Sequence, residues 1–552
     1  MERTRLGSGR SLLTAIVIAS LTAALAQGAT AQDVEHNPAL FASPSYPAGF
    51  DEKATYYPEA LGPLTRAITT DSPEAQKFFN QGIQMMYAFT PLRAARSFRQ
   101  AQREDPNCAM CFWAEAWAWG PYLNGPMGRD DAPRAYENIQ KAKKLAGDHA
   151  NEVERALIEA MAIRYEVEHD SDARKMLDSA YARAMAEVYE RFPHDLDVGT
   201  LYGESLMLLE PRRGRWDIEK PAVQKIHSVL EAVLAMDITH PGACHLYVHA
   251  TEPTIKPEKA EACADHLGAS IPGASHIQHM PSHTYNRIGR WGDAVRGNLA
   301  AWHTDQRAEA DLAWAIYPSH NLHMLLFAAS MDGQGAIAIQ AAKDYGKIVP
   351  GGAFYHALTL LRFGRFDEIL EMDDPPDRTI QRGFWDFARG YAYLRTDDPG
   401  RAEVYLEKVR RAVENADENA SFRGHSATDL LGTVAGILEG EILRHQGDNE
   451  GAVAVLEAAI EHEDDLRYDE PEPLNFSARH WLGDLLLDME RYQEAEEVFT
   501  AALEDHPMNG WSLYGLEEAL RAQDKGKRAD EVHKLFLEAW ARSDTWIRGS
   551  VF

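Results

Sequence analysis

Apolar and polar positions along the chain repeat with the period of an α-helix. Residues 151–190 carry long runs of Ala, Leu and Met on this period, and Pro193 ends them because proline cannot continue a helix. Patterns typical of strands are nearly absent. We therefore predict an all-α chain with an irregular N-terminal arm over residues 32–60, where proline is dense.

A recurring pair of small residues indicates helical hairpins. A Gly is followed twelve residues later by an Ala in four places, at Gly82 and Ala94, Gly390 and Ala402, Gly440 and Ala452, and Gly483 and Ala495. Such residues let two helices approach closely, and an aromatic residue (Phe98, Phe499) follows in the first and last sets. The pattern resembles the tetratricopeptide repeat (TPR), a pair of antiparallel helices of about 34 residues. We expect a TPR-like solenoid of helical hairpins.

The predicted solenoid has two parts of different composition. Residues 61–370 hold most of the histidines and form the predicted histidine-rich TPR-like domain. Residues 383–552 form the predicted C-terminal TPR domain, which is plainer in chemistry. The proline-rich stretch between them, residues 371–382, is the predicted boundary.

The first residues have the features of a secretion signal. Three basic residues (Arg3, Arg5, Arg10) precede a mostly apolar stretch over residues 11–26, and small residues suited to cleavage follow at 24–26 and 29–31. We predict a signal peptide over residues 1–31 and a periplasmic or secreted mature chain. An uncleaved anchor is the alternative, but the apolar stretch is short for a membrane span. No stable membrane insertion is expected after cleavage.

The charge of the chain excludes one class of partner. The formal net charge is −29 at pH 7, which repels nucleic acid and anionic membrane surfaces. We therefore expect no nucleic-acid partner. The sequence does not indicate an oligomeric state.

The histidines are concentrated in one region and spaced to share helix faces. Ten of the 22 lie between His240 and His323. Residues three or four apart lie on one face of a helix, so such spacings can bring imidazoles to a common point. The spacing selects these candidate metal ligands: His245, His249, Glu252, His276, His279, His283, His320 and His323.

Imidazole is the commonest protein ligand of transition metals. Many neutral imidazoles with few carboxylates favour copper first, zinc second and iron third. Six histidines split three and three would suit a dicopper oxygen site, whereas three with open positions would suit one catalytic metal. Two other interpretations remain: a polar groove for an organic or peptide ligand, and hydrogen bonds between repeats. A zinc-protease motif is disfavoured because Leu246 stands where that motif needs Glu.

Two cysteines flank the start of an aromatic-rich helix. Cys108 and Cys111 form a Cys-x-x-Cys pair, and Trp113, Trp117 and Trp119 follow. We expect the tryptophans to be core residues. The pair is interpreted as a disulfide, as two packed thiols or as metal ligands, since neither the thioredoxin context nor a haem-attachment histidine is present. With Cys244 and Cys263, the chain has four cysteines and three ways to pair them.

Several longer motifs resemble a family of exported bacterial TPR proteins. The motifs are DPNCAMC with a following GPYLN, HLYVHATE, HMPSHTYNRIGR and HNLH, within residues 75–345. The family is largely uncharacterised, so the resemblance implies the fold rather than a reaction. It carries over to these positions: Cys108, Cys111, Asn124, His245, His249, Glu252, His279, His283, Arg287, Asn321 and His323.

The chain departs from this family pattern at two cysteines. Cys244 stands where the pattern has Asn, and Cys263 stands in a helix that is usually rich in Ala. Both departures fall on successive predicted helices. We hypothesise a local disulfide between Cys244 and Cys263.

Three functions follow from these patterns, and the third is metal storage or delivery, which the acidic surface favours. The first is an exported TPR protein whose histidine-lined groove binds a transition metal in a copper-type redox or oxygen-using site. Glu252, Tyr285 and Arg287 are its candidate catalytic residues, although the sequence assigns no enzyme class. The alternative is a non-catalytic TPR adaptor that binds a peptide or protein partner in the groove.

Overall fold

The structure is a computed structural model that describes residues 45–212, 214–417 and 419–551. The predicted signal peptide and residues 32–44 of the predicted arm lie outside the described residues. The chain divides into two units, Met1–Ser45 and Tyr46–Phe552, and the second is described below. In it, the end of the predicted arm is irregular apart from one 3-10 helix, η3 (Pro58–Ala60).

The helices before the histidine-rich region begin at residue 73. They are α1 (Pro73–Tyr87), α2 (Pro91–Glu104), α3 (Ala109–Ala118), α4 (Asp131–His149), α5 (Glu152–Ile163), α6 (Ser171–Arg191), α7 (Leu196–Met207) and α8 (Pro221–Met236). The histidine-rich region follows with α9 (Pro241–Thr251), η4 (Pro257–Ala260), α10 (Glu261–Leu267), α11 (Ser275–His279), α12 (Pro281–Ile288), α13 (Trp291–Ala308) and α14 (Pro318–Met331).

The remaining helices form the C-terminal repeats. They are α15 (Gly335–Ile348), α16 (Ala353–Arg362), α17 (Phe366–Glu371), α18 (Thr379–Arg395), α19 (Pro399–Glu414), α20 (Ala427–Gln446), α21 (Asn449–Asp464), α22 (Arg479–Asp488), α23 (Tyr492–Asp505), α24 (Gly510–Ala522) and α25 (Gly526–Ala539). Two short strands, β1 (Ser421–Phe422) and β2 (His425–Ser426), pair antiparallel before α20.

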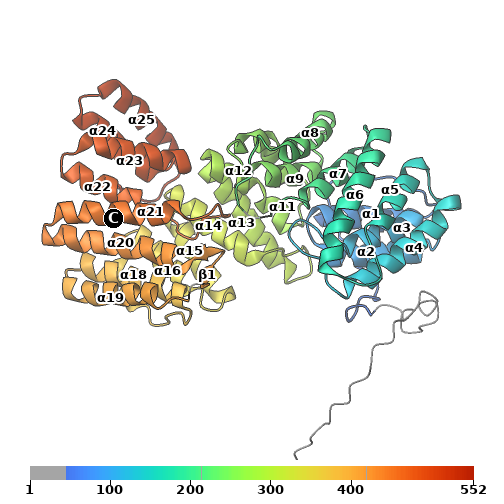
Figure 1. The fold of residues 1–552 in the computed structure, drawn as a ribbon, viewed down its shortest axis with the longest axis horizontal. Helices are drawn as coiled ribbons and strands as arrows, with labels where there is room; N and C mark the ends of the chain where they lie inside the picture. Colours follow the sequence, from blue (N-terminus) through green and yellow to red (C-terminus); the bar gives the residue numbers. More distant parts are fainter. Residues whose placement is uncertain (1–44, 213, 418, 552) are drawn as a thin grey trace, which may run out of the picture. The chain divides into compact units, whose positions relative to one another are not determined.

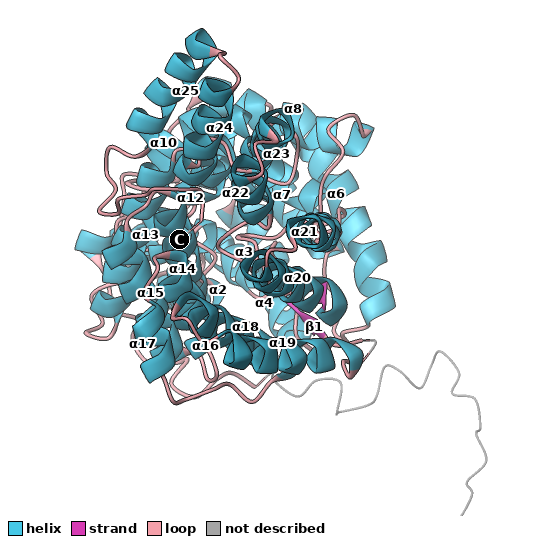
Figure 2. Cartoon of the chain, turned by 90° about the vertical axis from the view of Figure 1, so that its left-hand side faces the viewer, coloured by secondary structure: helices cyan, strands magenta, loops and turns pink. Residues whose placement is uncertain are grey.

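The prediction of an all-α helical repeat fold is confirmed. Helices make up most of the described chain, and β1 and β2 are its only named strands (Figure 2). Neighbours in sequence pack as hairpins, for example α1 with α2, α18 with α19, and α20 with α21. Figure 1 shows α9 to α14 between the earlier helices and the C-terminal repeats.

Glycine allows the close helix contacts that the repeat pattern predicted. A Cβ atom added to Gly82 of α1 would lie 2.3 Å from the ring of Phe98 on α2, so a larger residue would not fit. In the later repeat, a Cβ on Gly483 would lie 2.4 Å from the Phe499 ring, and one on Gly515 would lie 2.2 Å from it. Phe499 therefore packs against its own hairpin and the next one.

The buried apolar residues form two clusters. The first runs from Phe50 to Ile316, and the second from Ala264 to Ala539, so they overlap in sequence around α10 to α14. The proposed boundary at residues 371–382 lies within the span of the second cluster, and the division into two domains stays a prediction. The three tryptophans of α3 and its end are buried, which confirms them as core residues.

Two helix starts in the histidine-rich region have distinctive local structure. His276 and His279 lie on the short helix α11, and Pro281 begins α12. The residue before α14 is Tyr317, which has a positive φ of 57°, and no side chain caps that helix. In the described part of the chain, no helix has the length and apolar character needed to span a membrane.

All four cysteines are paired in the structure. Cys108 and Cys111 are joined at the start of α3, with Cα atoms 5.4 Å apart. Cys244 on α9 is joined to Cys263 on α10, with Cα atoms 5.1 Å apart. No cysteine is therefore free to serve as a metal ligand.

Candidate metal centre

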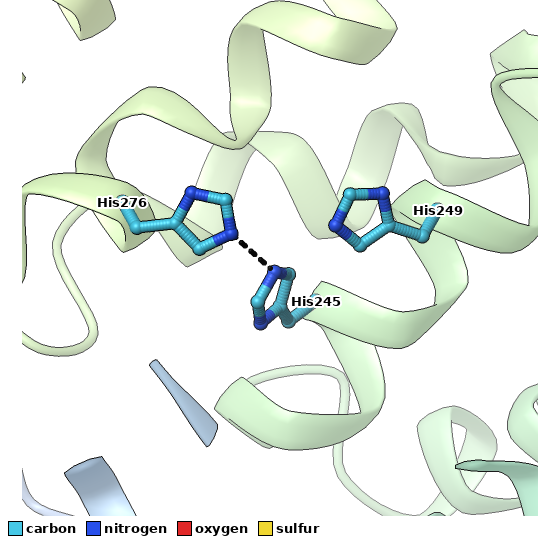
Figure 3. Close-up of side chains that lie close together, drawn as sticks. All are labelled: His245, His249 and His276. Atoms are coloured by element: carbon cyan, nitrogen blue, oxygen red, sulfur yellow. Dashed lines mark hydrogen bonds between the residues drawn. The ribbon is translucent and has the colours of Figure 1, made fainter. Parts of the chain in front are cut away.

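The first group of three histidines comes from two helices. Pro241 begins α9, and one turn separates His245 from His249 on its inner face. His276 of α11 meets them, and one ring nitrogen from each of the three lies within 4.8 Å of the others. All three side chains are buried. Figure 3 shows the three rings turned toward the same space.

The second group also draws on separate helices. His279 ends α11, His283 lies on α12 and His320 lies in the first turn of α14. One ring nitrogen from each again lies within 4.8 Å of the others. The ring centroids of His279 and His320 are 4.6 Å apart. His320 is partly exposed, whereas the other two histidines are buried.

The two groups adjoin each other. The ring centroids of His249 and His283 are 5.6 Å apart, and those of His276 and His279 are 5.7 Å apart. Each of these pairs joins one histidine of the first group to one of the second. The six histidines therefore form one continuous cluster with two points of convergence.

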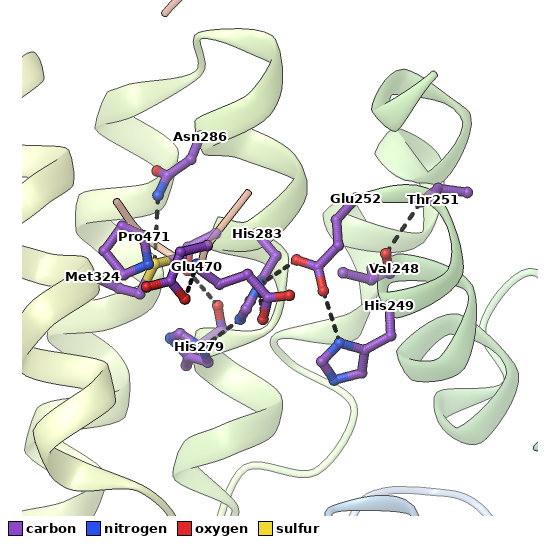
Figure 4. A network of polar contacts seen from close by, with 12 residues as sticks. Val248, His249, Thr251, Glu252, His279, His283, Asn286, Met324, Glu470 and Pro471 are labelled. Atoms are coloured by element: carbon purple, nitrogen blue, oxygen red, sulfur yellow. Dashed lines mark hydrogen bonds and ion pairs between the residues drawn. The ribbon is translucent and has the colours of Figure 1, made fainter. Parts of the chain in front are cut away.

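Glu252 contacts one histidine of each group through its carboxylate. It caps the end of α9, and its Oε1 atom lies 2.9 Å from Nδ1 of His249. Its Oε2 atom accepts a hydrogen bond from Nδ1 of His283 (Figure 4). One carboxylate thus orients one imidazole of each group, as carboxylates commonly do behind metal-bound histidines. Both oxygens are engaged, so Glu252 is a positioning residue in this arrangement.

Two other acceptors fix the orientation of neighbouring rings. Nδ1 of His245 lies 2.6 Å from the carbonyl oxygen of Tyr87, which can only accept. Nδ1 of His279 lies 2.7 Å from Oδ1 of Asn298. Asn298 cannot be turned around, because its Nδ2 donates to the carbonyl of Ala294 at 2.8 Å. Both histidines therefore carry their proton on Nδ1 and present a bare Nε2.

These constraints produce an unusual contact between His279 and His283. Their Nε2 atoms are 2.8 Å apart, and the Nδ1 atom of each already donates to an acceptor. In the neutral forms, both Nε2 atoms hold a lone pair and neither holds a proton. A metal cation bound by both lone pairs would remove this repulsion. A second proton on one of the two rings would also remove it, because that ring could then donate a hydrogen bond to the other.

Burial keeps most of these imidazoles neutral. It lowers the pKa of His245 to about 3 and lowers that of four others well below its usual range: His249, His276, His279 and His320. Neutral imidazole is the form that binds metals. His283 differs, since burial opposes its charge but the carboxylates of Glu252 and Glu470 outweigh it and raise its pKa.

Glu470 and Arg212 reach the centre from segments that the sequence did not single out. A carboxylate oxygen of Glu470 lies 3.6 Å from Nδ1 of His283, and another lies 3.3 Å from a guanidinium nitrogen of Arg212. Together with His249 and Glu252, Glu470 forms a third group with atoms within 4.8 Å. Burial, and to a smaller extent the negative charge of Glu470, raises the pKa of Glu252 to about 7. Burial would also raise the pKa of Glu470, but Arg212 and His283 lower it.

One sequence feature could have pointed to Glu470. It lies in residues 465–478 between α21 and α22, a stretch far longer than an ordinary repeat turn. Long connections within compact domains usually carry function. This one also concentrates acidic residues and prolines in the sequence DEPEP at residues 469–473.

Some predicted residues are not brought to the cluster. His323 lies one turn further along α14 and belongs to neither group, and its ring centroid is 4.4 Å from that of Tyr355. The hydroxyl of Tyr285 donates to Asp265 at 2.9 Å. Arg287 lies 3.5 Å from the carbonyl of Thr254. Neither residue has a described contact with the six histidines.

The two asparagines carried over by resemblance have supporting contacts. Asn124 accepts a hydrogen bond from Nε of Arg212 at 2.9 Å, so it helps to hold the partner of Glu470. Asn321 donates to Asp305 at 2.8 Å and to the carbonyl of Ile316 at 3.1 Å. The second asparagine thereby fixes the start of α14, from which His320 projects.

Comparisons with known proteins identify the repeat and no further function. Residues 476–504, which include α22 and all of α23 except its last residue, match the family model named Tetratricopeptide repeat. No curated protein matches the chain. Similar solved structures include the hetero-tetramer Cut9-Hcn1, with 11% identity, a TM-score of 0.28 and coverage of 85% of this chain and 74% of that one. Naa15/Naa10 bound to HypK-THB is 14% identical, with a TM-score of 0.21 and coverage of 85% and 73%.

Proposed function

We propose that this chain is an exported repeat protein that binds two transition-metal ions, one at each group of three histidines. Copper is the preferred metal, and the pair serves an oxidation–reduction or oxygen-using reaction. Export through the predicted signal peptide would mean that the metal is acquired outside the cytoplasm.

The contact between His279 and His283 is the observation that carries the proposal. When both rings are neutral, their bare Nε2 atoms repel each other at 2.8 Å, and a buried polar atom without a partner costs about 1–3 kcal/mol. The raised pKa of His283 favours the second proton as the competing way to satisfy this contact. Nε2 of His249 supports a bound metal, since it is buried and has no hydrogen-bond partner among the described residues. A metal ion at each group would supply the missing partners.

The donor set favours copper over the alternatives. The first and second groups each offer three imidazoles and no carboxylate, and copper has the highest affinity of the divalent first-row metals for such nitrogen sites. Zinc also accepts three histidines, whereas iron and calcium favour more oxygen ligands. The adjoining groups would place the two ions next to each other, and paired ions can act on one bound molecule.

Metal analysis of the full-length chain tests the proposal. After incubation with copper and removal of the excess, we expect two copper ions per chain. His276→Ala in the first group and His320→Ala in the second should each lose one ion. His323→Ala is a matched control, because it is a buried histidine on the helix of His320 but outside both groups. Circular dichroism confirms that each variant is folded.

Two results would contradict the proposal. One is the absence of stoichiometric metal from the folded wild-type chain after incubation with copper, zinc or iron. The other is full metal content in both His276→Ala and His320→Ala. In the first case the contact between His279 and His283 holds a second proton, and the non-catalytic adaptor becomes the better interpretation of the repeats.

A further inference from the structure

A large cavity adjoins the second group of histidines. Its volume is about 800 Å³, within the range of roughly 300–1,000 Å³ that is typical of small-molecule sites. His320 and Tyr317 line it, and His320 is the one partly exposed histidine of the six. A molecule in this cavity can therefore reach the second group directly.

Tyr317 connects the cavity to both groups of histidines. Its ring lies edge-on to that of His276, with centroids 5.2 Å apart, and its hydroxyl lies 3.1 Å from that of Tyr122 across the cavity wall. Its backbone is in the left-handed region, with φ of 57°. Such a conformation costs about 1–3 kcal/mol in a non-glycine residue and is concentrated at functional sites.

The walls of the cavity are aromatic and apolar on one side. The connection between α3 and α4 contributes Tyr122, Leu123 and Met127, and the end of α7 contributes Met207. Flat apolar surfaces of this kind suit an aromatic ring, which stacks on tyrosine and packs against methionine.

One basic residue that lines the cavity has no acidic partner in the described chain. Each acidic residue of the lining is paired with a basic side chain: Asp178 with Arg174, Glu210 with Lys220, Asp469 with Arg423, and Glu470 with Arg212. Lys175 on α6 is exposed and lines the cavity, and no acidic group of the described chain lies within ion-pair distance of it. The unpaired charge at the mouth is therefore positive.

We infer that the cavity binds a small aromatic carboxylate as the substrate of the proposed metal pair, with the carboxylate at Lys175 and the ring packed against the wall formed by Tyr122 and Tyr317. This inference rests on the proposed function for the reaction, but the binding itself does not need the metal. The local positive charge of Lys175 attracts a carboxylate, although the net charge of −29 on the whole chain opposes the approach of an anion. The aromatic end is held at the partly exposed His320.

The probes are benzoate, benzyl alcohol and benzylammonium, added to the full-length chain with and without copper. We expect benzoate to bind more tightly than the neutral or cationic probe. Lys175→Met should weaken benzoate binding about fivefold, as expected for loss of an exposed ion pair, and leave benzyl alcohol unchanged. Lys143→Met is the matched control, an exposed lysine on α4 that does not line the cavity. Leu208→Trp should abolish binding by filling the cavity.

Absorption of the copper-loaded chain links binding to the metal. Benzoate should change the visible spectrum in the wild type and in Lys143→Met, but not in Leu208→Trp. The inference is overturned if benzoate does not bind, if Leu208→Trp binds it normally, or if bound benzoate leaves the copper spectrum unchanged. A chain that takes up no copper overturns the proposed function, while the dependence on Lys175 still reports on the cavity by itself.

Discussion

Replacing Asn298 by leucine removes the hydrogen bond that fixes the proton on His279, together with the one that Nδ2 of Asn298 donates to the carbonyl of Ala294. Asn298 is fully buried and accepts from Nδ1 of His279 at 2.7 Å. Leucine has a similar size but cannot accept. His279 is then free to move its proton to Nε2 and donate to Nε2 of His283, 2.8 Å away. A hydrogen bond would then join the two Nε2 atoms without a metal. Nε2 of His279 would no longer offer a lone pair to a metal ion.

The two effects of this change have different sizes. Loss of a partner behind a metal-bound histidine typically lowers metal affinity about 10–100-fold, or about 1.4–2.7 kcal/mol. The metal-free chain loses the two hydrogen bonds of Asn298, to His279 and to the carbonyl of Ala294, and gains one between His279 and His283, each worth about 0.5–1.5 kcal/mol. We therefore expect weaker copper binding by Asn298→Leu with a net loss of one hydrogen bond, or about 0.5–1.5 kcal/mol, in the unfolding free energy of the metal-free chain.

Competition with a chelator of known affinity measures the copper binding, and urea denaturation measures stability. Asn298→Asp is the matched control, because its carboxylate still accepts from His279 and should preserve the affinity. Wild-type affinity in Asn298→Leu would refute the argument from the fixed proton. A loss of stability much larger than the loss of affinity would instead show that Asn298 is needed only for packing.

Further changes test the scaffold. Gly483→Ala should lower the unfolding free energy by about 1–3 kcal/mol because its Cβ would lie 2.4 Å from Phe499, and thermal denaturation would reveal it; an unchanged midpoint contradicts the close contact. Replacing both Cys244 and Cys263 by Ala removes a disulfide that closes a loop of 19 residues, and should cost about 3 kcal/mol in urea denaturation. Non-reducing peptide mapping that found both thiols free would refute this bond. Burial raises the pKa of Glu463 to about 7, so its contribution is full below about pH 4.5 and is lost as pH rises through 7. The Glu463→Gln variant should therefore show a flatter dependence of stability on pH over this range.

Helix periodicity predicted most of the cluster because its contacts are local. His245 and His249 share a face of α9 at a spacing of four, and the close spacing of His276, His279 and His283 survives the break between α11 and α12. His323 shares a spacing of three with His320, but its ring packs against Tyr355 and it belongs to neither group of histidines. Spacing limits which residues can converge, but the packing of the next helix decides which of them do.

The sequence could not predict how the histidines divide into two groups. It depends on how α9 crosses α11 and on where α14 begins, and both depend on contacts between distant segments. His245 is held by the backbone of Tyr87 from α1, and His283 approaches Glu470 from the far end of the chain. Every residue has a backbone carbonyl, so a residue pattern cannot show that the carbonyl of Tyr87 accepts a hydrogen bond from His245. Only the folded structure shows which ring nitrogens carry no proton.

The same contacts explain why the histidine-rich region is unlike the plainer repeats around it. An ordinary repeat buries apolar residues between its helices, as Phe499 does. Between α9, α11, α12 and α14 the buried positions are imidazoles, whose charged forms are strongly disfavoured there. Apolar side chains at these positions would stabilise the solenoid at least as well. Imidazoles with their outer nitrogens tied to Glu252 and Asn298 are therefore better explained by a ligand at their inner nitrogens than by the needs of the fold.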